Sequence, residues 1–137
     1  MCQASSRGPL RFVLLEHDTR ANAASPPDPA SVHWDLMIEL APGAALATWR
    51  LSRDPSLSDE LIPAERIADH RRDYLEYQGP ISGGRGRVRR IDEGHVEFAY
   101  LNPHDSAPSA PQSCPGGVME FAFHGSRIVG PRTLLLQ

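Results

Sequence analysis

The chain has 137 residues, 40 % of them hydrophobic, which is the size of one ordinary domain with enough apolar side chains for a core. Its net charge of −3 excludes a general electrostatic attraction to nucleic acid, so any phosphate binding must depend on local cations. Two cysteines do not make a disulfide framework and no run approaches the ~18 apolar residues of a membrane span, so we expect a cytoplasmic protein. We also expect it to be a monomer.

The first half of the chain indicates short strands joined by loops. Residues 1–10 are polar and are expected to form a flexible N-terminus, and residues 11–137 are expected to form one domain. Apolar patterning predicts three strands, over residues 11–17, 32–40 and 45–51. The composition of residues 21–30 predicts a loop, and Pro42-Gly43 turns the chain between the second and third strands.

The middle of the chain mixes short strands with helical patterns. A helical turn is expected around residues 58–61 and a short strand at 65–68. The spacing of apolar residues then predicts a helix over 70–78 that ends at Gly79-Pro80.

The last third of the chain indicates more strands. A hairpin is predicted around Asp92-Glu93-Gly94, followed by a loop over residues 102–117. The final strands are expected at residues 119–123, 128–129 and 133–136. About seven or eight short strands with one or two short helices predict a mainly β fold, a compact single-domain antiparallel β-barrel.

The strand predicted over residues 32–40 bears most directly on function. Its even positions are all apolar, whereas its odd positions include His33, Asp35 and Met37. Because strand side chains alternate, the even set is expected to face the core and the odd set an open surface. His33 and Asp35 then project side by side, with Cα atoms about 6–7 Å apart at a rise of ~3.3 Å per residue.

This pair has two interpretations. His17 ends the preceding strand, and antiparallel pairing would bring it beside His33. Two imidazoles and one carboxylate with open positions suit Mn, Fe or Zn better than Mg or Ca, which favours a divalent metal site. The alternative is a surface histidine–aspartate pair, with His17 as a solvated strand end.

Two other segments carry groups that suit a phosphate. His70 and Tyr74 are four residues apart, so on a helix they would share one face, with His70 as hydrogen-bond donor or general acid. The alternative is a solvated helix start with Tyr74 packed on the core. Gly83-Gly84-Arg85-Gly86, with Arg87 after it, offers close backbone approach and guanidinium groups, although a glycine-rich turn is the more common meaning.

The order of these motifs resembles the 3′-phosphoesterase domain family of bacterial DNA ligase D, including its free-standing relatives. That family has a histidine after its first strand and then a His-Tyr-Asp-Phe-Arg-Leu-Glu strand. The similar segments here are Glu16-His17-Asp18-Thr19-Arg20, His33-Trp34-Asp35-Leu36-Met37-Ile38-Glu39, Thr48-Trp49-Arg50-Leu51-Ser52-Arg53-Asp54-Pro55, Asp69-His70-Arg71-Arg72-Asp73-Tyr74, Gly84-Arg85-Gly86-Arg87-Val88 and Phe121-Ala122-Phe123-His124-Gly125. Together they span most of residues 11–136.

The resemblance implies a compact β-barrel that trims DNA 3′ ends, removing a terminal ribonucleoside and then the remaining 3′-phosphate. By position, His17, His33 and Asp35 would bind the metal, which is manganese in the family, with zinc or another transition metal as alternatives. His70 and Tyr74 would hold the scissile phosphate or assist the leaving group. The implied partners are DNA or RNA 3′ ends and a separate DNA ligase or polymerase.

Departures from the family pattern leave a second hypothesis open. Arg53 stands where the family has a lysine, but the family arginine two residues after the aspartate is Met37 here. Losing a charge-assisted contact to phosphate costs about 1.5–3 kcal/mol, unless Arg85 or Arg87 supplies a replacement. The chain is therefore expected to be either a metal-dependent phosphoesterase in DNA repair or a non-catalytic metal- or phosphate-binding module that recognises nucleic-acid ends or a repair partner.

Overall fold

The structure is a computed structural model that describes residues 7–20, 31–100 and 117–137. The described part is mainly β, and η2 is a short 3-10 turn. The elements in chain order are β1 (Arg7–Asp18), β2 (Val32–Ile38), β3 (Leu46–Leu51), β4 (Ile62–His70), η2 (Arg72–Leu75), β5 (Gly79–Pro80), β6 (Arg87–Tyr100), β7 (Val118–Gly125) and β8 (Val129–Leu136).

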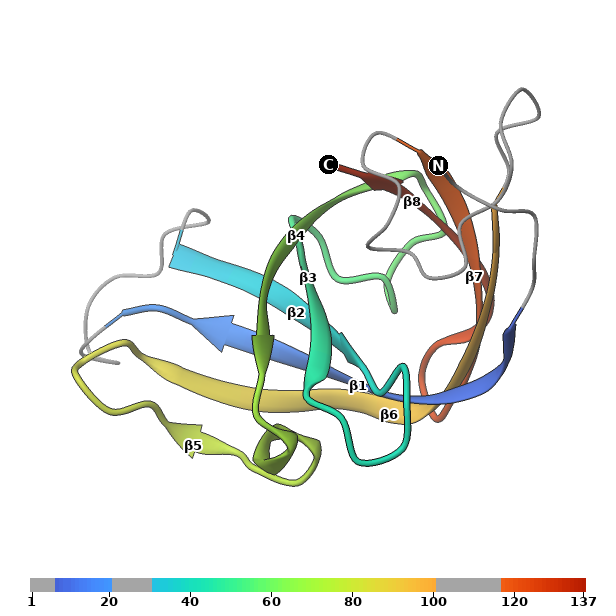
Figure 1. Ribbon diagram of the computed structural model, residues 1–137. Helices are drawn as coiled ribbons and strands as arrows, with labels where there is room; N and C mark the ends of the chain where they lie inside the picture. The colour runs from blue at the N-terminus through green and yellow to red at the C-terminus, as the bar shows by residue number, and fades with distance from the viewer. Residues whose placement is uncertain (1–6, 21–30, 101–116) are drawn as a thin grey trace.

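Seven of these strands form a closed barrel, which confirms the predicted fold class (Figure 1). The strand order is β1-β2-β3-β4-β8-β7-β6, and β6 pairs back with β1 to close the ring, while β5 adds to β6 outside it. All pairs are antiparallel except β4–β8, which is parallel. Strands that alternate in direction around a ring of odd number must leave one parallel pair, and here it lies where the two halves of the chain meet.

The predicted hairpin around Asp92-Glu93-Gly94 is wrong, because β6 runs straight through these residues. A Cβ on Gly94 would lie 2.3 Å from the His124 carbonyl oxygen, so this glycine permits close approach of β7 and makes no turn. The Asp92 carboxylate is buried and accepts backbone N–H groups of the β7–β8 turn, from Ser126, Arg127 and Ile128 at 2.7–2.9 Å.

Other element boundaries also differ from expectation. β1 begins at Arg7, and β4 covers the whole of Ile62–His70. Residues 58–61 are not helical, since the turn lies just before them, where the Asp54 carboxylate accepts the Ser56 N–H at 2.8 Å. The helix predicted over 70–78 is reduced to η2. The loops expected at 21–30 and 102–116 and residues 1–6 of the expected flexible N-terminus lie outside the described residues.

The core has two layers, one inside the barrel and one outside. Large apolar side chains from all seven barrel strands fill the interior, among them Leu36, Trp49 and Phe121. A second cluster, which we call the outer cluster, packs on the opposite face of β1 and β2 and consists of Val13, Leu15, Met37, Leu46, Leu75 and Val88.

The outer cluster changes the expected character of the odd face of β2. The even positions of β2 face the barrel interior as predicted, but the odd positions are not an open surface, because Asp35 and Met37 are only 2 % and 1 % exposed. The connection between β4 and β6, which carries η2 and β5, lies outside the ring of strands (Figure 1). Its Leu75 belongs to the same outer cluster as Met37. The candidate ligands therefore lie in a covered recess.

Candidate metal centre and adjoining cavities

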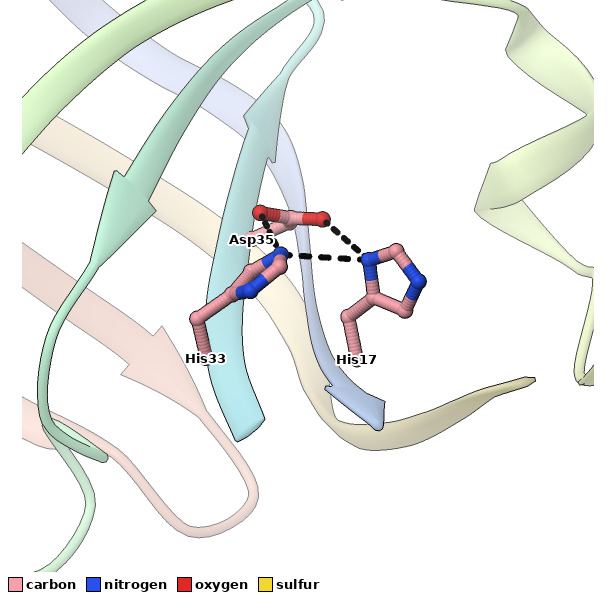
Figure 2. A group of neighbouring side chains, drawn as sticks. All are labelled: His17, His33 and Asp35. Carbon is pink, nitrogen blue, oxygen red and sulfur yellow. Dashed lines mark hydrogen bonds and ion pairs between the residues drawn. The ribbon is translucent and has the colours of Figure 1, made fainter. Parts of the chain in front are cut away.

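Two histidines and an aspartate meet on the outer face of the β1–β2 pair (Figure 2). His17 and His33 are direct partners in the antiparallel register, which confirms the predicted juxtaposition. The His17 Nδ1 and His33 Nε2 atoms are 3.1 Å apart. The Asp35 carboxylate lies behind both rings, with Oδ2 3.7 Å from His17 Nδ1 and Oδ1 3.4 Å from His33 Nε2.

This group could hold a metal ion. One ligand atom from each residue can be chosen so that all lie within 4.8 Å of one another. Bonds of about 2.0–2.2 Å to a common ion place neighbouring ligand atoms roughly 3–3.5 Å apart, which matches the two closest approaches here. Asp35 Oδ1 is buried without a hydrogen-bond partner among the described residues, as expected for an atom that a cation would satisfy.

The electrostatics of the group also suit a cation. Burial raises the pKa of Asp35, but the favourable polar and charge interactions with the nearby His17 and His33 rings outweigh burial and lower the pKa to about 2. The carboxylate is therefore ionised at neutral pH. The nearby Asp35 carboxylate raises the pKa of His17 despite the desolvation of its ring, so a proton on His17 competes with a metal for the same site.

The glycine-rich segment orients one of the ligands. His17 Nε2 lies 2.9 Å from the Arg85 carbonyl oxygen, and donating its N–H there leaves the lone pair of Nδ1 directed at the site. Gly86 follows with φ of +90°, and a Cβ at this position would lie 1.8 Å from the Asp18 carbonyl oxygen. Only glycine lets this turn approach β1 closely enough to reach His17.

His70 and Tyr74 reach the metal centre without sharing a helix. His70 ends β4 and Tyr74 lies in η2, with ring centroids 5.4 Å apart in an edge-to-face contact. Both line a cavity of about 80 Å³ together with His17 and Asp35, and we call this the reaction cavity. His70 Nδ1 lies 3.0 Å from the Ala68 carbonyl oxygen, so Nε2 is the nitrogen left for a ligand. Met37 also lines this cavity.

The three predicted phosphate-binding arginines have different positions. Arg85 lines the reaction cavity, and its Nε donates to the Ser82 carbonyl oxygen at 2.8 Å. Arg53 is not among the cavity residues, since its guanidinium pairs with Glu60 at 2.9 Å and bonds the Leu61 carbonyl oxygen. Arg87 is exposed on β6 opposite Asp18 and does not line the cavity either.

Sequence reasoning missed Arg50. It is the direct partner of Asp35 on β3, is exposed, and lines a cavity of about 420 Å³ beside His33. Its guanidinium makes no hydrogen bond or ion pair with a described residue, and its charge opposes protonation of His17. The signal was present, because a turn centred on Pro42-Gly43 places position 50 opposite position 35.

Within the described residues, no helix is long and apolar enough to cross a membrane. Three features of the structure bear on function. They are the metal-binding geometry, the recessed His70–Tyr74 pair and the nearby guanidinium groups. No protein-family model matches the chain, and no curated protein matches it.

Proposed function

We propose that the protein is a manganese-dependent phosphoesterase that processes nucleic-acid 3′ ends in DNA repair. The reaction is removal of a 3′-terminal ribonucleoside and then of the 3′-phosphate, which leaves a 3′-hydroxyl for a separate DNA ligase or polymerase. The observation that carries this proposal is the shared cavity, in which a three-residue metal group adjoins an imidazole and a phenol.

The ligand set supports a metal with open coordination positions. Three protein ligands leave sites for water and substrate, which is typical of catalytic rather than structural metal centres. A divalent ion held there supplies Lewis-acid polarisation of a phosphoryl oxygen and lowers the pKa of bound water. Mixed nitrogen and oxygen ligands fit manganese, and zinc is the alternative that the same residues would accept.

The other cavity residues have matching roles. His70 lines the cavity of about 80 Å³, and its Nε2 is the nitrogen left for a phosphoryl group because Nδ1 is bonded to the Ala68 carbonyl oxygen. As an imidazolium, with a proton on each nitrogen, His70 can donate the Nε2 proton to the leaving oxygen as water adds to phosphorus and the P–O bond breaks. The Tyr74 hydroxyl and the Arg85 guanidinium are positioned to donate hydrogen bonds to non-bridging oxygens.

The test is turnover of a DNA primer that ends in one ribonucleotide or a 3′-phosphate, with and without manganese. We expect product only with metal, either a primer that has lost its terminal ribonucleoside or a primer that has lost its 3′-phosphate. His33→Ala should lose both product formation and metal binding. The matched control is His124→Ala, an exposed histidine on β7 that lies outside the site and should leave both unchanged.

A binding module is the second candidate, and Met37 favours it. This thioether lines the reaction cavity with 1 % exposure and donates no hydrogen bond to a phosphate. The binding module is the correct assignment if calorimetry shows manganese binding that His33→Ala abolishes and no product forms even at high protein concentration. In that case phosphorylated ends should bind without being cleaved.

A further inference from the structure

A third cavity adjoins Tyr74, and its lining combines aromatic rings with charged side chains. Its volume is about 330 Å³, at the small end of the roughly 300–1,000 Å³ of typical ligand pockets. It shares Tyr74, Ile81 and Arg85 with the reaction cavity, so the two cavities adjoin. The residues that carry recognition there are Arg71, Asp73, Tyr74, Tyr77 and Arg85.

The aromatic surface of this cavity is fixed and open. Tyr77 is 39 % exposed, yet its hydroxyl donates to the Pro80 carbonyl oxygen, which holds the ring in place. Tyr74 meets Tyr77 edge to face, with ring centroids 6.0 Å apart. An ordered, solvent-accessible ring beside arginines is the arrangement on which unpaired bases stack, because every base offers a π face.

The charges around the ring complement a nucleotide. The Arg71 guanidinium is exposed and makes no hydrogen bond or ion pair with a described residue, so it is available to a phosphate. Arg85 lies between this cavity and the reaction cavity, where it can contact the phosphate that joins them. The exposed Asp73 carboxylate supplies an acceptor for a base amine or a ribose hydroxyl.

We infer that this cavity binds one unpaired nucleotide of a nucleic-acid strand, with its base on Tyr77 and its phosphate on Arg71. The inference rests on the proposed function for the direction of the strand, since it places the reacting phosphate beside Arg85 and the neighbouring nucleotide beyond Tyr74. The substrate is then a single-stranded 3′ end, and a fully base-paired end must first unpair to enter.

Binding can be measured apart from catalysis. The full chain is titrated in EDTA with a fluorescein-labelled, 3′-phosphorylated single-stranded DNA oligonucleotide, and affinity is read by anisotropy. Tyr77→Leu should weaken binding by roughly 5- to 150-fold, the measured range for one base on one aromatic ring, whereas Tyr77→Phe keeps the ring and most of the affinity. Arg71→Gln should lower the slope of log affinity against log salt by about 0.7, one phosphate contact.

Arg127→Gln is the matched control, because this exposed arginine lies in the β7–β8 turn away from the cavity. It should leave affinity and salt slope unchanged. Native affinity and slope in Tyr77→Leu and Arg71→Gln, or no binding of the oligonucleotide by the native protein, would overturn the inference. Far-ultraviolet circular dichroism shows whether each variant is folded. If Tyr77→Leu does not fold, Arg71→Gln still tests the inference, because Arg71 is exposed.

Turnover separates this inference from the proposed function. With manganese, Tyr77→Leu should lower kcat/KM for the oligonucleotide by a larger factor than for bis(p-nitrophenyl) phosphate, which carries no base. If no substrate is turned over but the anisotropy pattern holds, the proposed activity fails and the nucleotide site stands. Equal losses for both substrates, with unaltered oligonucleotide binding, refute the nucleotide site and leave the activity intact.

Discussion

Substitution of Gly86 by alanine should weaken metal binding although Gly86 is not a ligand. A Cβ at this position would lie 1.8 Å from the Asp18 carbonyl oxygen, and such contacts do not occur below 3.0 Å. The turn must therefore retreat from β1 by about 1.2 Å. The Arg85 carbonyl, now 2.9 Å from His17 Nε2, would move beyond the ~3.5 Å limit of a useful hydrogen bond.

The magnitude follows from what that bond does. It fixes the tautomer and ring orientation of His17, and the loss of such an outer partner typically lowers metal affinity by roughly 10–100-fold, or about 1.4–2.8 kcal/mol. Adopting a positive φ adds about 1–2 kcal/mol of strain to any L-residue, which lowers overall stability without involving the metal. The two effects need to be separated.

Gly84→Ala separates them. Gly84 has φ of +70° in the same turn, but a Cβ there meets nothing within 4 Å, so this variant has the strain without the clash. Calorimetric titration of manganese into both variants, with thermal unfolding as the check on folding, should show weaker binding only in Gly86→Ala. Equal affinities in two folded variants would refute the role assigned to the Arg85 carbonyl.

Three more outcomes are expected. Asp92→Ala should lower the free energy of unfolding at neutral pH by about 2–4 kcal/mol, since several backbone N–H groups lose their acceptor. Burial raises the pKa of Asp92, but the hydrogen bonds from those N–H groups outweigh burial, so the folded pKa lies below the unfolded value of about 3.9. The stabilisation from Asp92 is therefore complete above about pH 3.9 and is lost as the pH falls through the folded pKa. In urea melts at low pH, the free energies of unfolding of the variant and the native protein should converge. Arg50→Gln should weaken the inhibition of phosphoesterase turnover by inorganic phosphate by roughly tenfold or more, because it removes a cation beside the site. Manganese affinity should not fall. Unchanged inhibition would exclude Arg50 as an anion contact. Manganese binding should release a proton near neutral pH and weaken as the pH falls, because the pKa of His17 is raised. Calorimetric binding enthalpies that are equal in buffers of different ionisation enthalpy would contradict this proton release.

The metal group could be predicted from the sequence because it depends on local rules. Alternation along β2 places His33 and Asp35 on one face, and antiparallel pairing brings His17 to His33. The same rules, with the turn at Pro42-Gly43, also specify Arg50 as the neighbour of Asp35. What they do not specify is that this face is covered.

The remaining differences arise from tertiary contacts. Asp92-Glu93-Gly94 has the composition of a turn, but the residues meet a distant turn and a neighbouring backbone, which no local pattern reveals. The burial of Met37 depends on Leu75, almost forty positions away in the chain. Arg53 was expected near the phosphate by position in a motif, whereas its ion pair with Glu60 is set by the conformation of its own loop.

The parallel β4–β8 pair bears on the order in which the protein folds. This pairing joins Ile62 to Leu134, and β5, β6 and β7 all lie between these two residues in the chain. Closure of such distant contacts is slow, whereas neighbouring antiparallel strands associate early. The three residues of the candidate metal group all belong to β1 and β2, so a divalent ion bound there would hold these two strands together whether or not the rest of the ring had closed.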